Sequence, residues 1–359
     1  MASFTDHAYR RLYEGLNYRL RSWAGGRLAG HCRPTFIGFL LTEFCNARCV
    51  HCNIWQNRGK EDSPTVAQWN TVLTDLRDWL GPVHVVFTGG EALLRPWALD
   101  VVSHAARLGF YVEHLTHGFW DDQSKIERLA LSGPSRVTVS LDGVGETHDL
   151  VRGKANFFKK ASTSIETLQR LQRDRGLRYT VRLKNVLMSH NLHEAERVAD
   201  FASKPGTEVF YQAIEQNYNT PEDARWFEHS PNWPRDPERA VAVVQRLIAL
   251  KQDGRHIANS VAQLEAMIPY FRDPDRFRVS IQSHSAHERR ALCSALTMLQ
   301  LQANGDVTVC SGQSPVGNIK SAPVRQIWET RPAYWMSGCC MERRLSEAER
   351  DARGVAQSA

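Results

Sequence analysis

The fold is decided by one stretch, Phe36-Ile-Gly-Phe-Leu-Leu-Thr-Glu-Phe-Cys45-Asn-Ala-Arg-Cys49-Val-His-Cys52. Its apolar first part, residues 36–41, predicts a short buried strand, and the three cysteines follow on the loop at the strand's C-terminal end. Because the spacing is short, one loop can direct all three thiolates at a single small inorganic core. Three thiolates are one ligand short of a closed zinc site or an all-cysteine iron–sulfur cluster. The loop therefore predicts a metal centre with one position open for chemistry.

Length and composition are ordinary for a soluble globular protein. The chain has 359 residues, of which 42% are hydrophobic and 23% charged, which allows one large domain and a smaller one. The net charge of +6 is modest and scattered, so no nucleic-acid partner is expected. There is no secretory signal, and no apolar run approaches the ~20 residues of a membrane span. Eight cysteines in such a chain favour metal or redox use over disulfides, so we expect a cytoplasmic protein without membrane contact.

The first 35 residues predict a helical extension. Leu12, Leu16, Leu20 and Trp23 recur at helical spacing among arginines, and we expect this apolar face to lie across the main domain. A helix on a membrane surface is the less favoured alternative. Cys32, alone in the following loop, is interpreted as a free structural thiol.

Strands and helices alternate from residue 36 onwards. Strands are predicted at 36–41, 84–88, 111–116, 136–141, 179–187 and 208–214, with helices near 66–80, 97–108, 122–132, 157–175 and 192–203. This alternation indicates parallel strands with right-handed crossovers. We therefore predict an α/β fold, a partial (β/α)6 TIM-like barrel over residues 36–220.

Polar groups follow these strands, at the edge where such folds carry their chemistry. They are Thr88-Gly89-Gly90-Glu91, Thr116-His117-Gly118, Ser140-Leu141-Asp142-Gly143, the strand residues Arg182, Lys184 and Asn185, and Gln212 and Glu215. Taken singly, each has a plain structural explanation. The cysteines could bind zinc with His51 or a distant ligand, Gly-Gly-Glu is a common turn, and Ser140 and Asp142 could cap a strand end.

The second part of the chain is predicted to form three further segments. A Pro- and Trp-rich boundary opens a helical bridge over 221–280, and a small domain follows over 281–345, with a charged tail over 346–359. Asn304-Gly305-Asp306 lies between two apolar stretches and predicts a β-hairpin. This segment also holds the second cysteine group: Cys293, Cys310, Cys339 and Cys340.

Taken together, the cysteine loop and the strand-end motifs resemble the radical S-adenosylmethionine (radical SAM) enzymes. The resemblance covers residues 36–215 and implies that Cys45, Cys49 and Cys52 hold a [4Fe–4S] cluster. In that superfamily, reductive cleavage of SAM yields a 5′-deoxyadenosyl radical that abstracts a hydrogen atom from the substrate. An electron donor such as flavodoxin or ferredoxin is implied as a partner.

Residues for SAM are implied in the same way. Gly89, Gly90 and Glu91 match the motif that receives the SAM amino group, since glycines allow close backbone approach and a carboxylate complements an ammonium. Ser140 and Asp142 match a further SAM-binding segment. His117 departs from the superfamily's usual Asn, and Arg152 matches a recurring element without an evident role.

The C-terminal cysteines are similar to the auxiliary-cluster domains called SPASM and twitch. Cys293, Gly305 and Cys310 fit the opening of that pattern, which implies a hairpin-plus-helix domain with a second [4Fe–4S] cluster. Cys339 and Cys340 would complete the ligand set. Because neighbouring residues of an extended chain point to opposite sides, a turn is needed for both to bind.

An auxiliary cluster can accept an electron from a substrate radical, which favours net oxidation. We therefore expect dehydrogenation, decarboxylation or a similar reaction on a small biosynthetic molecule, with no catalytic base assigned. The alternative is a peptide or protein maturase that oxidises or cross-links a side chain. It is less favoured because the 35 residues before the first strand are few for a leader-binding domain. A non-catalytic metal-binding or electron-transfer protein would have no use for the Gly-Gly-Glu motif.

Overall fold

The protein is seen in a computed structural model that describes residues 4–23, 28–57, 61–203, 205–221, 223, 225–274, 293–310 and 314–333. Its centre is one nine-stranded sheet in the order β6-β5-β4-β3-β2-β1-β7-β8-β9. The first six strands are parallel, as predicted: β1 (Phe36–Leu40), β2 (His84–Thr88), β3 (Tyr111–Thr116), β4 (Arg136–Ser140), β5 (Thr180–Leu187) and β6 (Thr207–Ala213).

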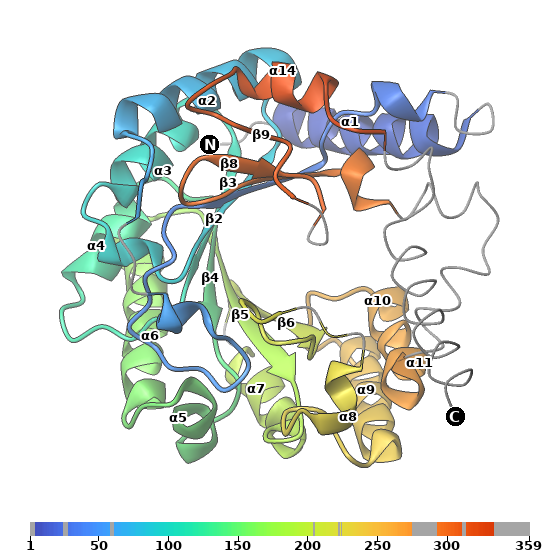
Figure 1. Cartoon of the computed structure of the whole chain (residues 1–359). Helices are drawn as coiled ribbons and strands as arrows, with labels where there is room; N and C mark the ends of the chain where they lie inside the picture. The colour runs from blue at the N-terminus through green and yellow to red at the C-terminus, as the bar shows by residue number, and fades with distance from the viewer. Residues whose placement is uncertain are drawn as a thin grey trace, which may run out of the picture.

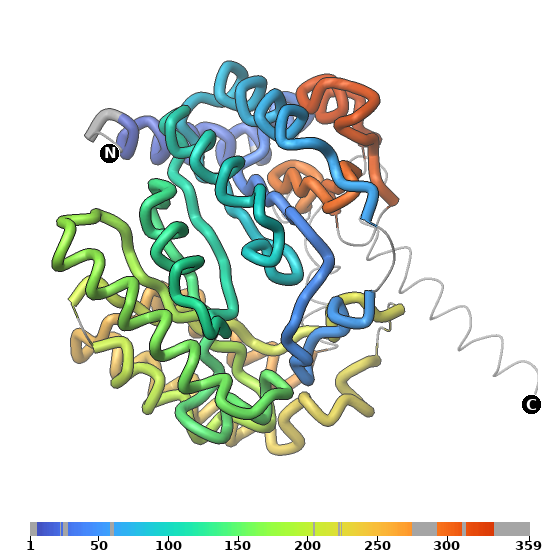
Figure 2. Tube along the Cα trace, turned by 90° about the vertical axis from the view of Figure 1, so that its left-hand side faces the viewer, coloured from blue at the N-terminus to red at the C-terminus, as the bar shows by residue number. Residues whose placement is uncertain are grey.

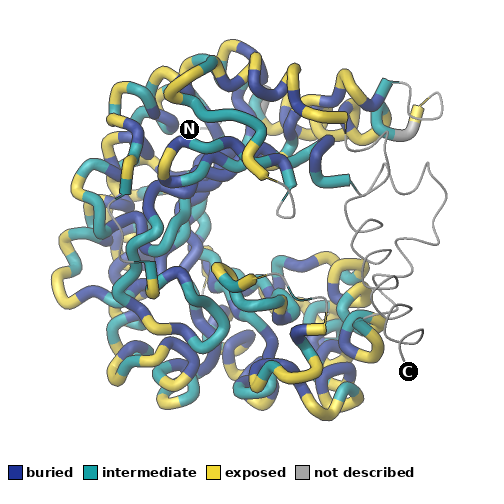
Figure 3. Tube along the Cα trace, in the orientation of Figure 1, coloured by how far each residue is buried: buried dark blue, intermediate teal, exposed yellow. Residues whose placement is uncertain are grey.

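Helices cover the outer, convex face of this sheet (Figures 1 and 2). They are α2 (Val66–Leu80), α3 (Ala98–Arg107), α4 (Ser124–Leu131), α5 (Glu146–Arg152), α6 (Phe157–Arg175) and α7 (Ala195–Phe201). The short α5 was missed in the sequence, and the others lie where predicted. Local signals explain their ends: Thr65 and Gln68 form a capping box before α2, and Gly176 adopts a left-handed conformation after α6. Figure 3 shows the buried residues concentrated along the sheet and the inner sides of the helices.

The six parallel strands curve without closing, which confirms the partial barrel. The free edge of β6 is covered by residues 256–259, which run beside it and pair Val209 with Ile257. Asn259 completes the cover, because its side chain accepts from the Tyr211 N–H at 2.8 Å and donates to the Tyr211 carbonyl at 2.9 Å. The helices α8 (Trp226–His229), α9 (Pro237–Gln252), α10 (Val261–Glu265) and α11 (Met267–Arg272) pack around this edge.

The predicted C-terminal hairpin extends the main sheet. β7 (Met298–Leu301) pairs in parallel with β1. β8 (Asp306–Thr308) pairs antiparallel with β7, and β9 (Gly317–Asn318) pairs antiparallel with β8. Helix α14 (Val324–Glu329) follows, and its Trp328 is buried in the same core as α2. Cys339 and Cys340 lie outside the described residues.

Helix α1 (Phe4–Ser22) forms as predicted but meets the domain with a different face. Leu12, Leu16 and Trp23 are 73%, 55% and 66% exposed, so the expectation that this apolar face lies across the domain was wrong for three of its four residues; the fourth, Leu20, packs against buried residues of the domain. The contact is made by aromatic and polar side chains: the Tyr13 hydroxyl donates to the Pro34 carbonyl at 2.5 Å, and Asn17 is buried. None of the described helices has the length and apolar content needed to cross a bilayer.

Candidate active site

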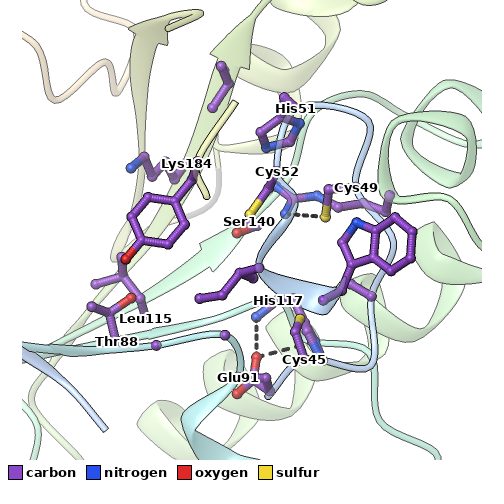
Figure 4. Close-up of a pocket in the computed structure, with 18 of the residues that line it drawn as sticks. Cys45, Cys49, His51, Cys52, Thr88, Glu91, Leu115, His117, Ser140 and Lys184 are labelled. Carbon is purple, nitrogen blue, oxygen red and sulfur yellow. Dashed lines mark hydrogen bonds and ion pairs between the residues drawn. The ribbon is translucent and has the colours of Figure 1, made fainter. Parts of the chain in front are cut away.

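A cavity of about 370 Å³ opens at the C-terminal ends of the parallel strands. Figure 4 shows side chains from several strand ends facing it. Seven of the eight cluster- and SAM-binding positions predicted for the barrel line it: Cys45, Cys49, Cys52, Gly89, Gly90, Glu91 and Ser140. The eighth, Asp142, lies behind the wall and is fully buried. The structure thus brings together residues that are up to about a hundred positions apart in the chain.

The loop after β2 is clamped directly against the cysteine loop. Gly90 N–H donates to the Thr42 carbonyl at 2.7 Å, and Glu91 N–H donates to the Phe44 carbonyl at 2.8 Å. A Cβ atom on Gly90 would overlap the Phe44 carbonyl oxygen. The glycine is therefore required for close approach, as predicted, but the backbone that it approaches is the cysteine loop.

A second clamp comes from residues that the sequence did not single out. The Glu61 carboxylate accepts from the Thr42 hydroxyl at 2.9 Å and forms an ion pair with Arg95. The Arg95 guanidinium lies over the Phe44 ring, 4.5 Å from its centre. These contacts are between distant segments, so no local pattern could have revealed them.

Helix α5 carries Arg152, and the structure gives this residue the role that the sequence left open. This guanidinium is buried, donates to the Cys49 sulfur at 3.5 Å and forms an ion pair with Asp142 at 2.5 Å. Burial alone would raise the pKa of Asp142, but the Arg152 charge outweighs it and holds that pKa below its usual value. Gly153, at φ +69°, ends the helix where a Cβ atom would overlap the Arg48 carbonyl oxygen. Asp142 therefore positions Arg152, and Arg152 contacts a predicted cluster ligand.

The Glu91 carboxylate is 1% exposed and ties β2 to β3. It accepts from the Thr116 hydroxyl at 3.1 Å, from the His117 N–H at 2.8 Å and from the Leu93 N–H at 3.2 Å. Burial raises the pKa of Glu91 to about 7 despite these donors. A carboxylate has about four acceptor positions, so one remains for a ligand.

His117 connects the same wall to the cysteine loop. Its Nδ1 accepts from the Phe119 N–H at 2.9 Å, so Nε2 carries the proton and donates to the Asn46 side chain at 2.6 Å. Burial holds the pKa of His117 well below its usual value, which keeps the ring neutral. Asn46, between the first two cysteines, is a further residue that the sequence did not indicate.

The opposite wall comes from β5, β6 and the loop that follows. Lys184, Gln212, Glu215 and Tyr218 line the cavity there, with His51 beside the cysteines. The Lys184 and Glu215 side chains form no hydrogen bond or close ion pair with any residue that the structure describes, and they attract each other electrostatically. A cation and an anion are thus available to a ligand on this side.

The donor set fits an iron–sulfur cluster. Three cysteine thiols line one cavity, and burial raises the pKa of Cys45 to about 12, which disfavours a free thiolate there. In the described part of the chain, no three His, Cys, Asp or Glu side chains converge as ligands of one metal ion. A [4Fe–4S] cluster ordinarily takes four thiolates, one at each iron, so three cysteines would leave its fourth iron for another ligand. The arrangement can hold such a group at the open end of the barrel.

The fold and the site define a class: an open parallel barrel that carries three cysteines on the loop after its first strand. The model of the Radical SAM superfamily matches residues 39–202, and this part of the chain is a Radical SAM domain. This confirms the resemblance noted in the sequence. Members use a [4Fe–4S] cluster and SAM as cofactors.

Curated relatives cover most of the chain at low identity. The AdoMet-dependent heme synthase of Methanosarcina barkeri is 26% identical, over 84% of this chain and 84% of its own length. The PqqA peptide cyclase of Streptomyces rochei is 27% identical, over 84% of this chain and 79% of its own.

Two solved structures share the fold. Streptococcus suis SuiB bound to S-adenosylmethionine has a TM-score of 0.61 at 14% identity, over 84% of this chain and 67% of its own. Native anSMEcpe with bound AdoMet has a TM-score of 0.56 at 16% identity, over 83% of this chain and 81% of its own.

Proposed function

We propose that this chain is a radical SAM enzyme that oxidises a small molecule of a biosynthetic pathway. The observation that carries the proposal is the single cavity lined by Cys45, Cys49 and Cys52 together with Gly89-Gly90-Glu91 and Ser140. When bound, the cluster and SAM supply a 5′-deoxyadenosyl radical that abstracts a hydrogen atom from the substrate. The protein's part is placement and exclusion of water.

We assign the first cluster to Cys45, Cys49 and Cys52. Burial raises the pKa of Cys49, and Arg152 opposes this because it donates to the Cys49 sulfur and carries a positive charge. Asp142 keeps this guanidinium in place through their ion pair. Asp142 therefore supports the site from behind the wall, in place of the direct SAM contact expected from the sequence.

We assign SAM to the β2 and β4 side of the cavity. The free acceptor position of Glu91 and the backbone of Gly89 and Gly90 suit its ammonium group. The Ser140 hydroxyl makes no hydrogen bond with the described residues and lines the same wall. The substrate is left with the β5–β6 wall, where the oppositely charged Lys184 and Glu215 side chains form no hydrogen bond with those residues.

The auxiliary cluster, with Cys293 and Cys310 among its ligands, provides an acceptor for the substrate electron and favours net oxidation. Support comes from the hairpin of β7 and β8. β7 pairs with β1, and Cys310 follows β8. A cytoplasmic enzyme reduced by a flavodoxin or ferredoxin fits this chemistry. The second candidate is a peptide-modifying enzyme, favoured by the similarity to PqqA peptide cyclase and, for the fold alone, to SuiB, which has also been solved with its precursor peptide SuiA.

Isotope transfer distinguishes these substrates. The reconstituted enzyme is incubated anaerobically with SAM, dithionite and uniformly deuterated small molecules or short peptides, and 5′-deoxyadenosine is analysed for deuterium. The proposal expects transfer from a small molecule, and Cys310→Ala should retain SAM cleavage while product formation stops. Transfer from peptides alone would favour the maturase. Undiminished product formation by Cys310→Ala would remove the electron-acceptor role.

A further inference from the structure

A second cavity, of about 280 Å³, lies at the β6 edge of the barrel, beside the candidate active site. It is bounded by β6 and by residues of α10 and α11. Gln212 and Glu215 line both cavities, so the two meet at these side chains. A cavity of about 150 Å³ is large enough to hold benzene, so this one can hold a ring-sized group.

The surface that this second cavity presents to a ligand is mainly apolar. It is formed by Phe210 and Ala213 of β6 and by Ala266, Met267 and Tyr270. An unbranched methionine side chain adapts its shape to an apolar ligand. We call this cavity the β6 groove.

Polar side chains of the β6 groove are engaged in holding the fold together. The Asn259 side chain accepts from and donates to the β6 backbone, at 2.8 and 2.9 Å. The Tyr270 hydroxyl donates to the Ile214 carbonyl at 2.7 Å, and the Gln263 side-chain oxygen accepts from the Ser260 N–H at 2.9 Å. These groups have little hydrogen-bonding capacity left for a ligand, which favours an apolar occupant.

The strand register connects the β6 groove with the side of the cavity assigned to SAM. Ser140 of β4 pairs with Lys184 of β5, and Lys184 pairs with Phe210 of β6. Residues paired in this way across parallel strands point to the same face of the sheet. Because neighbouring strands lie ~4.8 Å apart, the row from Ser140 to Phe210 spans about 10 Å, which one small molecule can bridge.

Two opposite charges lie between the ends of this row. The Lys184 and Glu215 side chains line the active-site cavity and form no hydrogen bond with the described residues, although they attract each other. A ligand that carries both a carboxylate and an ammonium group can pair with both. Hydrogen bonds between charged groups are about twice as strong as those between neutral ones.

We propose that the β6 groove, Lys184 and Glu215 together bind a free α-amino acid with a ring-sized apolar side chain. The carboxylate pairs with Lys184, the ammonium group pairs with Glu215, and the side chain occupies the β6 groove. The inference rests on the proposed function and names the substrate class of that same site.

Calorimetric titration of the reconstituted, SAM-loaded wild type tests each contact with a separate probe. L-Phenylalanine and L-tryptophan should bind about tenfold or more tightly than L-alanine, because their rings leave water on binding. They should also bind more tightly than phenethylamine, which lacks the carboxylate, and hydrocinnamate, which lacks the amine. Equal affinity for L-alanine, or no measurable binding of either aromatic amino acid, would overturn the proposal.

A bulky substitution tests the β6 groove itself. Ala266→Trp adds an indole at its wall and should weaken L-phenylalanine binding about tenfold, with the affinity for L-alanine unchanged. Ala262→Trp is the matched control, because Ala262 is exposed on the preceding α10 and does not line the groove. Equal binding of L-phenylalanine by both variants would show that the side chain lies elsewhere and overturn the assignment.

The charged residues are tested by crossing variants with probes. Glu215→Gln should weaken the binding of L-phenylalanine and phenethylamine but not of hydrocinnamate. Lys184→Met should weaken the binding of L-phenylalanine and hydrocinnamate but not of phenethylamine. An equal loss for all three probes in either variant would contradict the proposed pairing.

Two further results separate this inference from its alternatives. N-Acetyl-L-phenylalanine amide lacks both charges and should bind about tenfold more weakly than L-phenylalanine; equal binding would indicate a residue within a peptide and overturn the proposal. A wild type that binds L-phenylalanine as expected but releases no 5′-deoxyadenosine would remove the proposed function and leave this binding site. A wild type that releases 5′-deoxyadenosine without preferring L-phenylalanine to L-alanine would overturn this inference alone.

Discussion

At the scale of single residues, the site depends on close contacts that leave no space for a larger side chain. The glycines and cysteines of the cavity could be predicted from the sequence because each belongs to a short motif. Asn46, Glu61 and Gly153 could not, because their partners are distant in the chain. The role of Glu91 was predicted only in part, since its contacts to Thr116 and His117 require the fold.

The clearest residue-level test is Gly90→Ala. The new Cβ atom would overlap the Phe44 carbonyl oxygen, so the cysteine loop must move. We expect at least a tenfold loss of SAM cleavage and reduced iron in the first cluster, measured by product analysis and iron assay. Gly15→Ala, in α1 where nothing lies within 4 Å of the added atom, is the matched control. Equal SAM cleavage by both variants would show that the close contact between the loop after β2 and the cysteine loop is not needed for activity.

The ion pair between Asp142 and Arg152 gives a second test. Asp142→Asn leaves a buried guanidinium without its counter-ion and should lower the free energy of unfolding by about 3–5 kcal/mol. Denaturant titration measures this, with Arg152→Met and the double variant completing a cycle. We expect the double variant to be less destabilised than the sum of the single ones. Strict additivity would mean that the two side chains do not interact.

At the scale of elements, strands and helices were predicted well because their apolar periodicity and caps are local. The prediction of which face of α1 contacts the domain was wrong, since Leu12 and Leu16 point outward while Tyr13 and Asn17 pack inward. The joining of β7 to β1 was also beyond reach, because strand pairing depends on which edge is free and not on either strand alone.

The segment 256–259, which covers the free edge of β6, gives a prediction at the scale of elements. Asn259→Leu would leave the N–H and carbonyl of Tyr211 buried without partners, at about 1–3 kcal/mol each. We expect a lower denaturation midpoint and more aggregation, since an uncovered strand edge can pair with another chain. Light scattering on heating measures the latter. Glu265→Leu, at an exposed position of the neighbouring α10, is the control; similar behaviour of the two variants would count against the cover.

At the scale of the whole molecule, buried neutral histidines link stability to pH. His114 is fully buried on β3, and neither ring nitrogen has a hydrogen-bond partner among the described residues. Burial lowers its pKa to about 4, below the ordinary 6.5 of the unfolded chain. The unfolded state therefore binds the proton first, and stability falls as pH drops from 6.5 toward 4.

His114→Leu should remove this part of the acid sensitivity, about 3 kcal/mol at most, because the neutral imidazole is replaced by an apolar side chain of similar size. Unfolding free energies at pH 7.5 and 5 measure the difference, with exposed His7→Gln as the control. The same pH slope in the wild type and His114→Leu would exclude His114 as a cause.

The central claim is that the cavity cleaves SAM with a cluster held by Cys45, Cys49 and Cys52. The most direct measurement is the release of 5′-deoxyadenosine and methionine from SAM by the anaerobically reconstituted enzyme with dithionite. The account predicts release by the wild type and none by Cys49→Ala. Release by Cys49→Ala at the wild-type rate, or none by a wild type that carries its iron, would contradict it.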